Sequence, residues 1–507
     1  MIEILQNLGM GFAVALAPVN LLYCFVGVLV GTVIGVLPGI GPVTTVAILL
    51  PLTFGMNPTS ALIMLAGIYY GSQYGGSTTA ILINTPGESA SIMTCLDGYQ
   101  MARKGRAGPA LGMAALASFI AGTAGVVLLM LLARPLVTVA LSFGPAEYFA
   151  LMLLALCTLG GLVGESVAKG LLMGAFGLLL GTIGSDPMTG ASRFTYGIAS
   201  LLDGLEFLPV AIGLFAVAEV LTTAERSVAH QIYETRITGL LPTREDWWAC
   251  RFTLVRASVI GFIVGVLPGA GSTLASILAY LAEKRASRHP ERFGTGVIEG
   301  VAAPEAANNA ASAGAMVPLL TLGVPGSATT AVMLGALMLW GLRPGPLLFE
   351  KNADLVWGLI ASMYIGNVML LILNLPLIGL WVRLLRVPTH VLLPFILLFS
   401  FTGTYAVSAN VFDLYVMVAF GILGYLLQRY GFPVAPIVLG LILGPMLETH
   451  LRRALIISRG DWSIFVQRPI AAVLLAAVLV YLALPAIAWA WRRGGRGERG
   501  RSKFTSS

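Results

Sequence analysis

Charged side chains are scarce in this 507-residue sequence, and their scarcity sets the class of protein. Lys, Arg, Asp and Glu together make up 10% of the residues, whereas 57% are hydrophobic. A soluble globule covers its surface with far more charge than this. The composition therefore excludes a water-soluble fold and predicts an all-α polytopic membrane protein.

Residues that carry enzyme chemistry are equally sparse. The four histidines are scattered, and the four cysteines form no CxxC pair, so we expect neither a disulfide framework nor a resident metal ion. The zinc-protease pattern HExxH and the nucleotide-binding pattern GxxxxGK[ST] are both absent. The sequence predicts no catalytic residues and no cofactor, and it argues against an ATP-driven pump. No Lys or Arg precedes the first apolar run, which differs from a secretory signal peptide.

What the sequence does contain is a repeated motif. GVLPGIG at 35–41 recurs as GVLPGAG at 265–271, each time at the end of an apolar run. Pro removes a backbone donor and Gly adds backbone freedom, so a helix cannot continue unbroken through either copy. Three further matches follow in the same order: RAGP at 106–109 with RPGP at 343–346, TPG at 85–87 with VPG at 324–326, and AFG at 175–177 with AFG at 419–421. Chance matches in apolar sequence are the alternative, but the shared order favours an internal repeat.

Apolar runs of about 20 residues are long enough to span a membrane. They occur at 17–37, 109–133, 146–163, 167–184, 207–224, 353–382, 390–407, 411–427, 432–447 and 470–491. The stretches flanking the motifs, 42–88 and 251–340, are interrupted and read as re-entrant hairpins or broken helices, giving about 10–12 membrane segments. The predicted units are a first repeat at 1–221, a polar linker at 222–253, a second repeat at 254–450, an interfacial segment and last span at 451–491, and a basic cytosolic tail at 492–507.

The distribution of Lys and Arg predicts that the two repeats are inverted. In the first half the basic loop is RKGRAG at 103–108; in the second half basic residues lie before the motif and in EKRASRHPER at 283–292. By the positive-inside rule, the first half enters from outside and the second from the cytosol. The basic tail is then cytosolic, where it contacts anionic lipid rather than nucleic acid.

Two segments qualify this topology. We expect the linker at 222–253 to be a connecting loop with an interfacial helix that Trp247 and Trp248 anchor. The segment 451–469 is placed outside although it is rich in arginine, which suggests an interfacial helix or a docking surface for an external partner. Its arginines are Arg452, Arg453, Arg459 and Arg468.

The candidate binding residues cluster around the two breaks. Amide hydrogens at a helix N-terminus attract an anion, and freed carbonyls where a helix stops can hold Na⁺. The candidates in the first half are Pro38, Gly39, Gly41, Thr44, Ser77, Thr78, Asn84, Pro86, Gly87 and Glu88. Those in the second half are Pro268, Gly269, Gly271, Ser272, Thr273, Glu305, Asn308, Asn309, Pro325, Gly326 and Ser327. For each Ser and Thr, ordinary close packing of membrane helices remains the alternative.

Two of these candidates, Glu88 and Glu305, are ionisable. A carboxylate repels an anionic substrate but can coordinate a transient Na⁺ or carry a proton. Asn308 and Asn309 follow Glu305 by three and four residues and share its face if the stretch is helical. The alternative for both carboxylates is a helix-terminus or interface charge.

Four long segments resemble one transporter family: GVLPGIGPVTTVAILLP, YYGSQYGGSTTAILINTPGE, PEAANNAASAGAMVPLLTLGVPGS and LRRALIISRGD. They are similar to the large membrane subunit of the tripartite tricarboxylate transporters, the TctA family, from about residue 17 to about 470. The resemblance implies a multi-pass permease of the bacterial inner membrane that works with a small membrane subunit and a periplasmic solute-binding protein. It would import tricarboxylates or dicarboxylates coupled to Na⁺ or H⁺. A transporter that works without a binding protein and an intramembrane enzyme are the alternatives.

Overall fold

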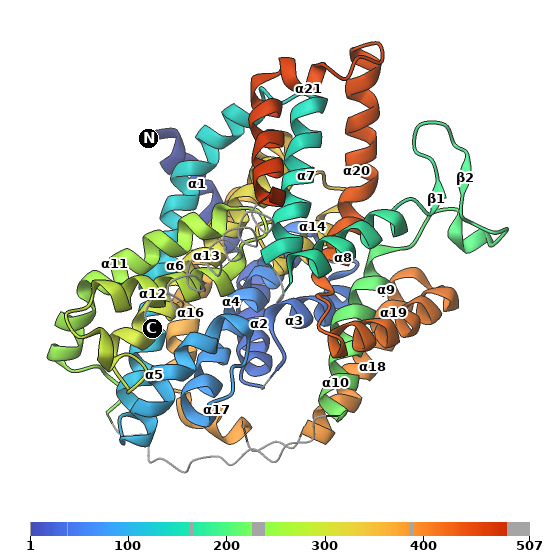
Figure 1. Ribbon diagram of the computed structural model, residues 1–507. Helices are drawn as coiled ribbons and strands as arrows, with labels where there is room; N and C mark the ends of the chain where they lie inside the picture. The colour runs from blue at the N-terminus through green and yellow to red at the C-terminus, as the bar shows by residue number, and fades with distance from the viewer. Residues whose placement is uncertain (1, 38, 163–165, 226–238, 386–388, 484–507) are drawn as a thin grey trace, which may run out of the picture.

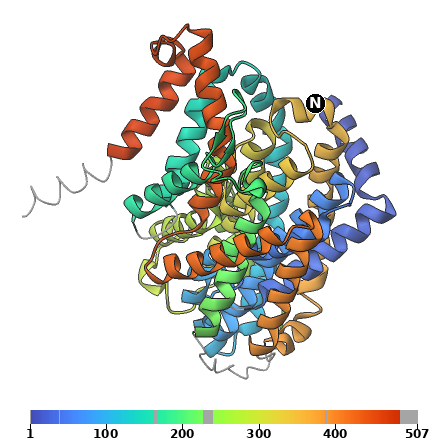
Figure 2. The same ribbon diagram turned by 90° about the vertical axis from the view of Figure 1, so that its right-hand side faces the viewer.

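The computed structural model describes residues 2–37, 39–162, 166–225, 239–385 and 389–483. These residues form an assembly of helices with one short β-hairpin, seen from two sides in Figures 1 and 2. In the first half the helices are α1 Ile2–Ala15, α2 Pro18–Gly35, α3 Pro42–Leu49, α4 Pro58–Ile83, α5 Ile92–Arg103, α6 Ala107–Ala140, α7 Pro145–Leu162, α8 Val167–Leu180, α9 Phe207–Ile212 and α10 Ala218–Glu225. A π-helical turn, Gly213–Val217, joins α9 to α10, and strands β1 Gly184–Ser185 and β2 Ser192–Arg193 pair antiparallel.

The second half continues with eleven numbered helices. They are α11 Arg244–Val266, α12 Gly271–Ala286, α13 Glu299–Leu322, α14 Ala328–Leu339, α15 Pro346–Lys351, α16 Ala353–Asn374, α17 Ile378–Leu384, α18 Thr389–Ser408, α19 Val411–Arg429, α20 Ala435–Ile457 and α21 Ile464–Gln467. A further apolar helix covers Pro469–Ala483. Short 3-10 turns lie at Leu50–Thr53, Ser89–Ser91, Ala199–Leu201 and Pro290–Arg292.

Seven helices within the described ranges are long and apolar enough to cross a membrane, and six shorter apolar helices accompany them. The protein is therefore a multi-pass membrane protein, as the composition predicts. The longest span, α6, has 34 residues and measures about 50 Å at 1.5 Å per residue. Because the hydrocarbon core is about 30 Å thick, α6 is long enough to cross it.

Both copies of the repeated motif interrupt a helix. α2 ends at Gly35 and α3 begins at Pro42, whereas α11 ends at Val266 and α12 begins at Gly271. Gly39 and Gly269 have φ angles of +85° and +80°, in the left-handed region that favours glycine. The predicted breaks are confirmed. Their position at the membrane midplane, as tips of re-entrant hairpins, stays a prediction because no membrane is present.

The two halves pack their first long helices in the same way. α2 lies against α4, and α11 lies against α13. A Cβ atom at Gly35 would overlap the carbonyl oxygen of Ser72, and one at Gly265 would overlap that of Ala311. The first residues of these pairs are 230 positions apart and the second residues 239. The two halves are therefore similar in their helix–helix contacts as well as in their sequence motifs.

Late helices of each half pack against helices of the other half. The π-helical turn after α9 packs on α19, where Gly213 lies against the backbone of Met417. In the other half α20 packs on α8, where Gly440 lies against the backbone of Gly174. Such reciprocal contacts are those that two halves related by a two-fold rotation would make. Whether this axis lies in the membrane plane, as an inverted repeat requires, stays a prediction.

Two local features differ from the sequence-based expectation. Trp247 and Trp248 lie in the first turns of α11, a continuous helix from Arg244, rather than on a separate interfacial helix. α20 runs without interruption to Ile457, so the arginine-rich segment begins as a continuation of that helix. The end of the predicted last span and the basic tail, 484–507, lie outside the described residues.

Candidate functional site

A buried polar cluster surrounds Glu305 on α13. The side chain of Glu305 is fully buried, and its carboxylate accepts hydrogen bonds from Thr94 Oγ1 of α5 at 2.5 Å and from Ser77 Oγ of α4 at 2.6 Å. Asn308 Nδ2 donates at 3.3 Å, and Ser118 Oγ of α6 lies at 3.5 Å. Both carboxylate oxygens are therefore bonded, in every case by a neutral donor.

The two asparagines share this face, as their spacing predicts. Asn309 Nδ2 donates to the backbone oxygen of Glu305 at 3.2 Å and to Asn308 Oδ1 at 2.5 Å. Both amide side chains are buried. The stretch is a regular helix despite Pro304 and Pro318, so the Glu305 carboxylate and the Asn308 amide point to the same side.

A second group of polar side chains joins the two halves directly. Gln73 Nε2 of α4 donates to Ser312 Oγ of α13 at 2.5 Å, and both residues are fully buried. These two positions are 239 residues apart, so they correspond in the repeat. Tyr69, one turn before Gln73, places its hydroxyl 3.4 Å from Ser327 Oγ. The sequence analysis did not select Tyr69, Gln73 or Ser312, although the register of the repeat would have paired the last two.

In the first half, Glu88 lies beside the break. It is the N-cap of the turn Ser89–Ser91, and Ser91 Oγ donates to its backbone oxygen at 2.9 Å. The Glu88 Cβ lies 3.8 Å from the position that a Cβ atom on Gly41 would occupy. The Glu88 Cγ lies 3.1 Å from the position that a Cβ atom on Gly76 of α4 would occupy. A larger residue at position 76 would therefore press on the Glu88 side chain.

In the second half, Ser327 occupies the equivalent place. It is the N-cap of α14 and exchanges hydrogen bonds with Thr330 in a capping box. Its Cβ lies 3.7 Å from where a side chain at Gly271 would begin, and the amide of Gly271 donates to Gly326 at 3.3 Å. Each break is therefore held against the N-cap residue of the following short element in the same half.

Three buried polar atoms in this region lack a hydrogen-bond partner among the described residues. They are Glu88 Oε1, Gln73 Oε1 and the hydroxyl of Tyr70. Leaving a buried polar group unpaired costs about 1–3 kcal/mol. All three belong to α4 or to the residue packed against its Gly76, so each keeps a free position for a hydrogen bond.

Several predicted residues hold the backbone near the cluster rather than join it. Thr44 Oγ1 donates to the backbone oxygen of Phe215 at 3.3 Å, and Asn84 ends α4 in a left-handed conformation. Gly87 lies against the backbone of Gly76, and Gly326 against that of Ala315. Pro86 and Pro325 precede these two glycines in the loops that lead to the caps.

The remaining candidates lie at the edges of the site. Thr78 lines a cavity barely large enough for one water molecule, between α4, α6 and Asn374. Pro268 and Gly269 form the second break, where Gly269 lies against the backbone of Leu159. The candidates Ser272 and Thr273 are half-buried in the first turn of α12. Pro38 lies outside the described residues.

Comparison with known proteins identifies a family and two related sequences. Residues 21–439 match the Tripartite tricarboxylate transporter TctA family. An Agrobacterium vitis protein named "Uncharacterized 52.8 kDa protein in TAR-I ttuC' 3'region" is 53% identical over 490 residues, covering 96% of this chain and 98% of its own length.

A second Agrobacterium vitis protein, "Uncharacterized protein in TAR-II ttuC' 3'region", is 53% identical over 224 residues, which are 44% of this chain and 93% of that protein. No solved structure matches the chain. Because the family match covers most of the sequence and the first relative aligns over almost its full length, the chain belongs to the tripartite tricarboxylate transporter TctA family.

Proposed function

We propose that this chain is the permease of a binding-protein-dependent secondary transporter that imports tricarboxylates or dicarboxylates together with Na⁺ or H⁺. One observation carries the proposal. Two carboxylates, Glu88 and Glu305, are buried near the helix breaks, and within the described part of the chain no buried side chain belongs to Lys or Arg. A site of this composition needs a cation before it can accept an anion.

The hydrogen bonds distinguish the two carboxylates. Both oxygens of Glu305 are already bonded by Ser, Thr and Asn donors, which suits a positioning role. Glu88 retains an unpaired oxygen beside the first break. We therefore assign the coupling ion to Glu88, where Na⁺ or a proton removes the repulsion between the site and the substrate.

The backbone supplies the groups that would hold the anion. Both N-termini lie at the breaks: α3 begins at Pro42, which has no amide hydrogen, and α12 begins at Gly271, whose amide donates to Gly326, so the amides in question are those of the next residues in each first turn. Free amides at the start of a helix are oriented toward an anion and carry part of the helix dipole. An anion held by these amides balances the ion at Glu88 without needing a buried Arg.

The contacts at the ends of α6 support an orientation in the membrane. Near its start, Arg106 pairs with Asp246 at 2.7 Å and Lys104 donates to the Thr295 backbone at 2.6 Å, among the basic loops. By the positive-inside rule this end faces the cytosol. Near its other end, Glu147 accepts from the Gly144 amide at 2.8 Å and lies 3.8 Å from Arg468. We place this end outside. The bacterial inner membrane is the location that the proposed role as a permease implies.

The partners of the proposed system are a small membrane subunit and a periplasmic solute-binding protein. The test is uptake into vesicles that contain this chain and the small subunit, with labelled citrate and succinate as probes. We expect uptake to require a Na⁺ or pH gradient and the purified binding protein, but no ATP. Full uptake without the binding protein would instead show a transporter that works alone, and uptake driven only by ATP would contradict the proposal.

A further inference from the structure

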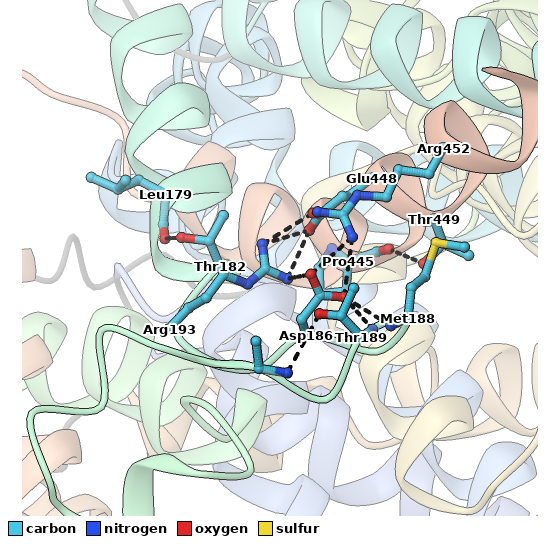
Figure 3. Close-up of polar contacts among 11 residues, drawn as sticks. Leu179, Thr182, Asp186, Met188, Thr189, Arg193, Pro445, Glu448, Thr449 and Arg452 are labelled. Atoms are coloured by element: carbon cyan, nitrogen blue, oxygen red, sulfur yellow. Dashed lines mark hydrogen bonds and ion pairs between the residues drawn. The ribbon is translucent and has the colours of Figure 1, made fainter. Parts of the chain in front are cut away.

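The loop at residues 184–204, which contains β1 and β2, extends from the helical body beside α20 (Figure 1). Four charged side chains fasten it there (Figure 3). Arg452 of α20 contacts Asp186 at 2.8 Å and Glu448 at 2.6 Å. Arg193 of the loop contacts Glu448 at 3.0 Å and Asp186 at 3.3 Å. Each arginine therefore bridges both carboxylates, and the network has no net charge.

Asp186 is also held from within the loop. Its carboxylate accepts from the amides of Met188 at 2.8 Å and Thr189 at 3.2 Å. The Met188 amide, followed by the Arg452 guanidinium, holds the pKa of Asp186 well below its usual range. The network therefore stays charged at physiological pH, and the loop keeps a fixed place on α20.

Beyond this base the loop presents aromatic side chains to its surroundings. Tyr196 is 85% exposed and Phe194 is 53% exposed. Both have positive φ angles, 48° and 53°, which cost a non-glycine residue about 1 kcal/mol or more. Irregular backbone does not survive against lipid hydrocarbon, so the loop lies outside the membrane core. Exposed aromatics on a strained but fixed backbone are typical of a protein-binding surface.

The neighbouring corner between α20 and α21 adds positive charge. Of the four arginines at 452–468, Arg452 and Arg468 are ion-paired. Arg453 and Arg459 are exposed and have no ion pair within the described residues. Trp462, which is 63% exposed, lies on the same corner. Two of the four arginines that argued against an external position are therefore neutralised by carboxylates. The other two are available to an acidic partner.

We propose that the 184–204 loop and residues 453–462, together called the external platform, dock the solute-binding protein through an acidic face on that protein. This inference rests on the proposed function, because it names the surface used by one partner of that system. The platform lies on the side opposite the basic loops at the start of α6, where a periplasmic protein would arrive. In the complex, the aromatic side chains of the platform would become buried against the binding protein, and its free arginines would orient that protein through charge.

The test measures uptake in vesicles as a function of the concentration of the binding protein that supports wild-type uptake. One variant carries Arg453→Gln and Arg459→Gln; the other carries Phe194→Asn and Tyr196→Asn, because Asn tolerates a positive φ and preserves the loop. We expect the half-saturating concentration to rise about tenfold in each, which corresponds to about 1.4 kcal/mol. Uptake at saturating binding protein should stay within about twofold of the wild type, because neither pair contacts the central site.

Matched controls lie on the cytosolic side. Arg285→Gln with Arg288→Gln removes two exposed arginines, and Tyr430→Asn removes an exposed tyrosine; both should leave half-saturation unchanged. Unchanged half-saturation in the platform variants would overturn the proposal. A shift seen with anionic lipid but not in neutral phosphatidylcholine vesicles would assign the surface to lipid headgroups and also overturn it. Wild-type uptake that ignores the binding protein would instead contradict the proposed function itself.

Discussion

The two halves of the molecule share a scaffold but differ in the chemistry placed on it. In each half a helix break lies against the N-cap of the next short element, and the helix before the break packs through glycine on its neighbour. The cap is Glu88 in the first half and Ser327 in the second. These two residues are 239 positions apart, the same spacing that relates Gln73 of α4 to Ser312 of α13. Contacts that form the scaffold are duplicated, whereas the ionisable groups are not.

A second carboxylate shows the same asymmetry. Glu305 on α13 corresponds to Ala66 on α4 by the same spacing. The first half therefore supplies the N-cap carboxylate and the second half supplies the carboxylate within the long helix. This inequality suits the proposed binding of one cation and one anion, because two identical half-sites would attract the same charge.

The shared scaffold is tested most severely at the glycines that join its long helices. Gly35→Leu and Gly265→Leu should each prevent recovery of folded protein, because a Cβ already overlaps a neighbouring carbonyl and backbone cannot move aside. The measurement is the yield of monodisperse protein in detergent. Gly9→Leu is the control, since no atom lies within 4 Å of a Cβ at that position. A normal yield for only one of the two variants would show that the halves do not share this packing.

The unequal caps are tested by making them alike. Glu88→Ser keeps a good N-cap residue and gives the first half the cap of the second. We expect the protein to fold but uptake to fall at least tenfold and to lose its dependence on the cation gradient, since the unpaired carboxylate oxygen is gone.

Ser327→Thr serves as the matched control, because it keeps a hydroxyl at the equivalent cap, and it should retain most uptake. Unchanged cation dependence in Glu88→Ser would remove Glu88 from coupling and leave the backbone carbonyls as the cation ligands.

The two breaks differ in the space around their left-handed glycines. Gly269→Ala places its Cβ against the backbone of Leu159, whereas Gly39→Ala meets only Glu219 Oε1, at 3.4 Å. Both pay the cost of a positive φ, about 1 kcal/mol, and Gly269→Ala should lose roughly 2 kcal/mol more through the clash. Thermal unfolding in detergent measures this difference. Equal midpoints would indicate that both breaks have equal room.

The smallest expected effect concerns the contact between corresponding positions. Gln73→Ala and Ser312→Ala each remove one partner of a buried hydrogen bond, and the double variant removes both. A double-mutant cycle on thermal stability should give a coupling energy of about 1 kcal/mol. Additive losses would mean that the two side chains do not interact in the folded protein.

The sequence was sufficient to predict what depends on neighbouring residues. Composition indicated the helical membrane class, the Pro-Gly motifs located both breaks, and helical spacing placed Asn308 beside Glu305. These features follow from backbone chemistry within one or two turns.

Contacts between distant segments were beyond such reasoning. Thr94 and Ser118 reach Glu305 only because α5 and α6 pack around α13, and no spacing in the sequence encodes that approach. The pairing of Arg452 with Asp186 spans 266 residues, so charge counting treated Arg452 as an uncompensated cation. Trp247 and Trp248 were assigned to a separate interfacial helix. In sequence, aromatic residues on such a helix cannot be told from aromatic residues in the first turns of a spanning helix.

The hydrogen bond between Gln73 and Ser312 joins corresponding positions of the two halves that carry different side chains. If the repeat arose by joining two copies of one ancestral unit, this position once faced its own copy. Two identical side chains at that position would have the same hydrogen-bonding groups, so one could not be a dedicated donor and the other a dedicated acceptor. Within a single chain each position can change alone, and here one is an amide donor while the other is a hydroxyl acceptor. The freedom to place Glu88 on one side and Ser327 on the other has the same origin.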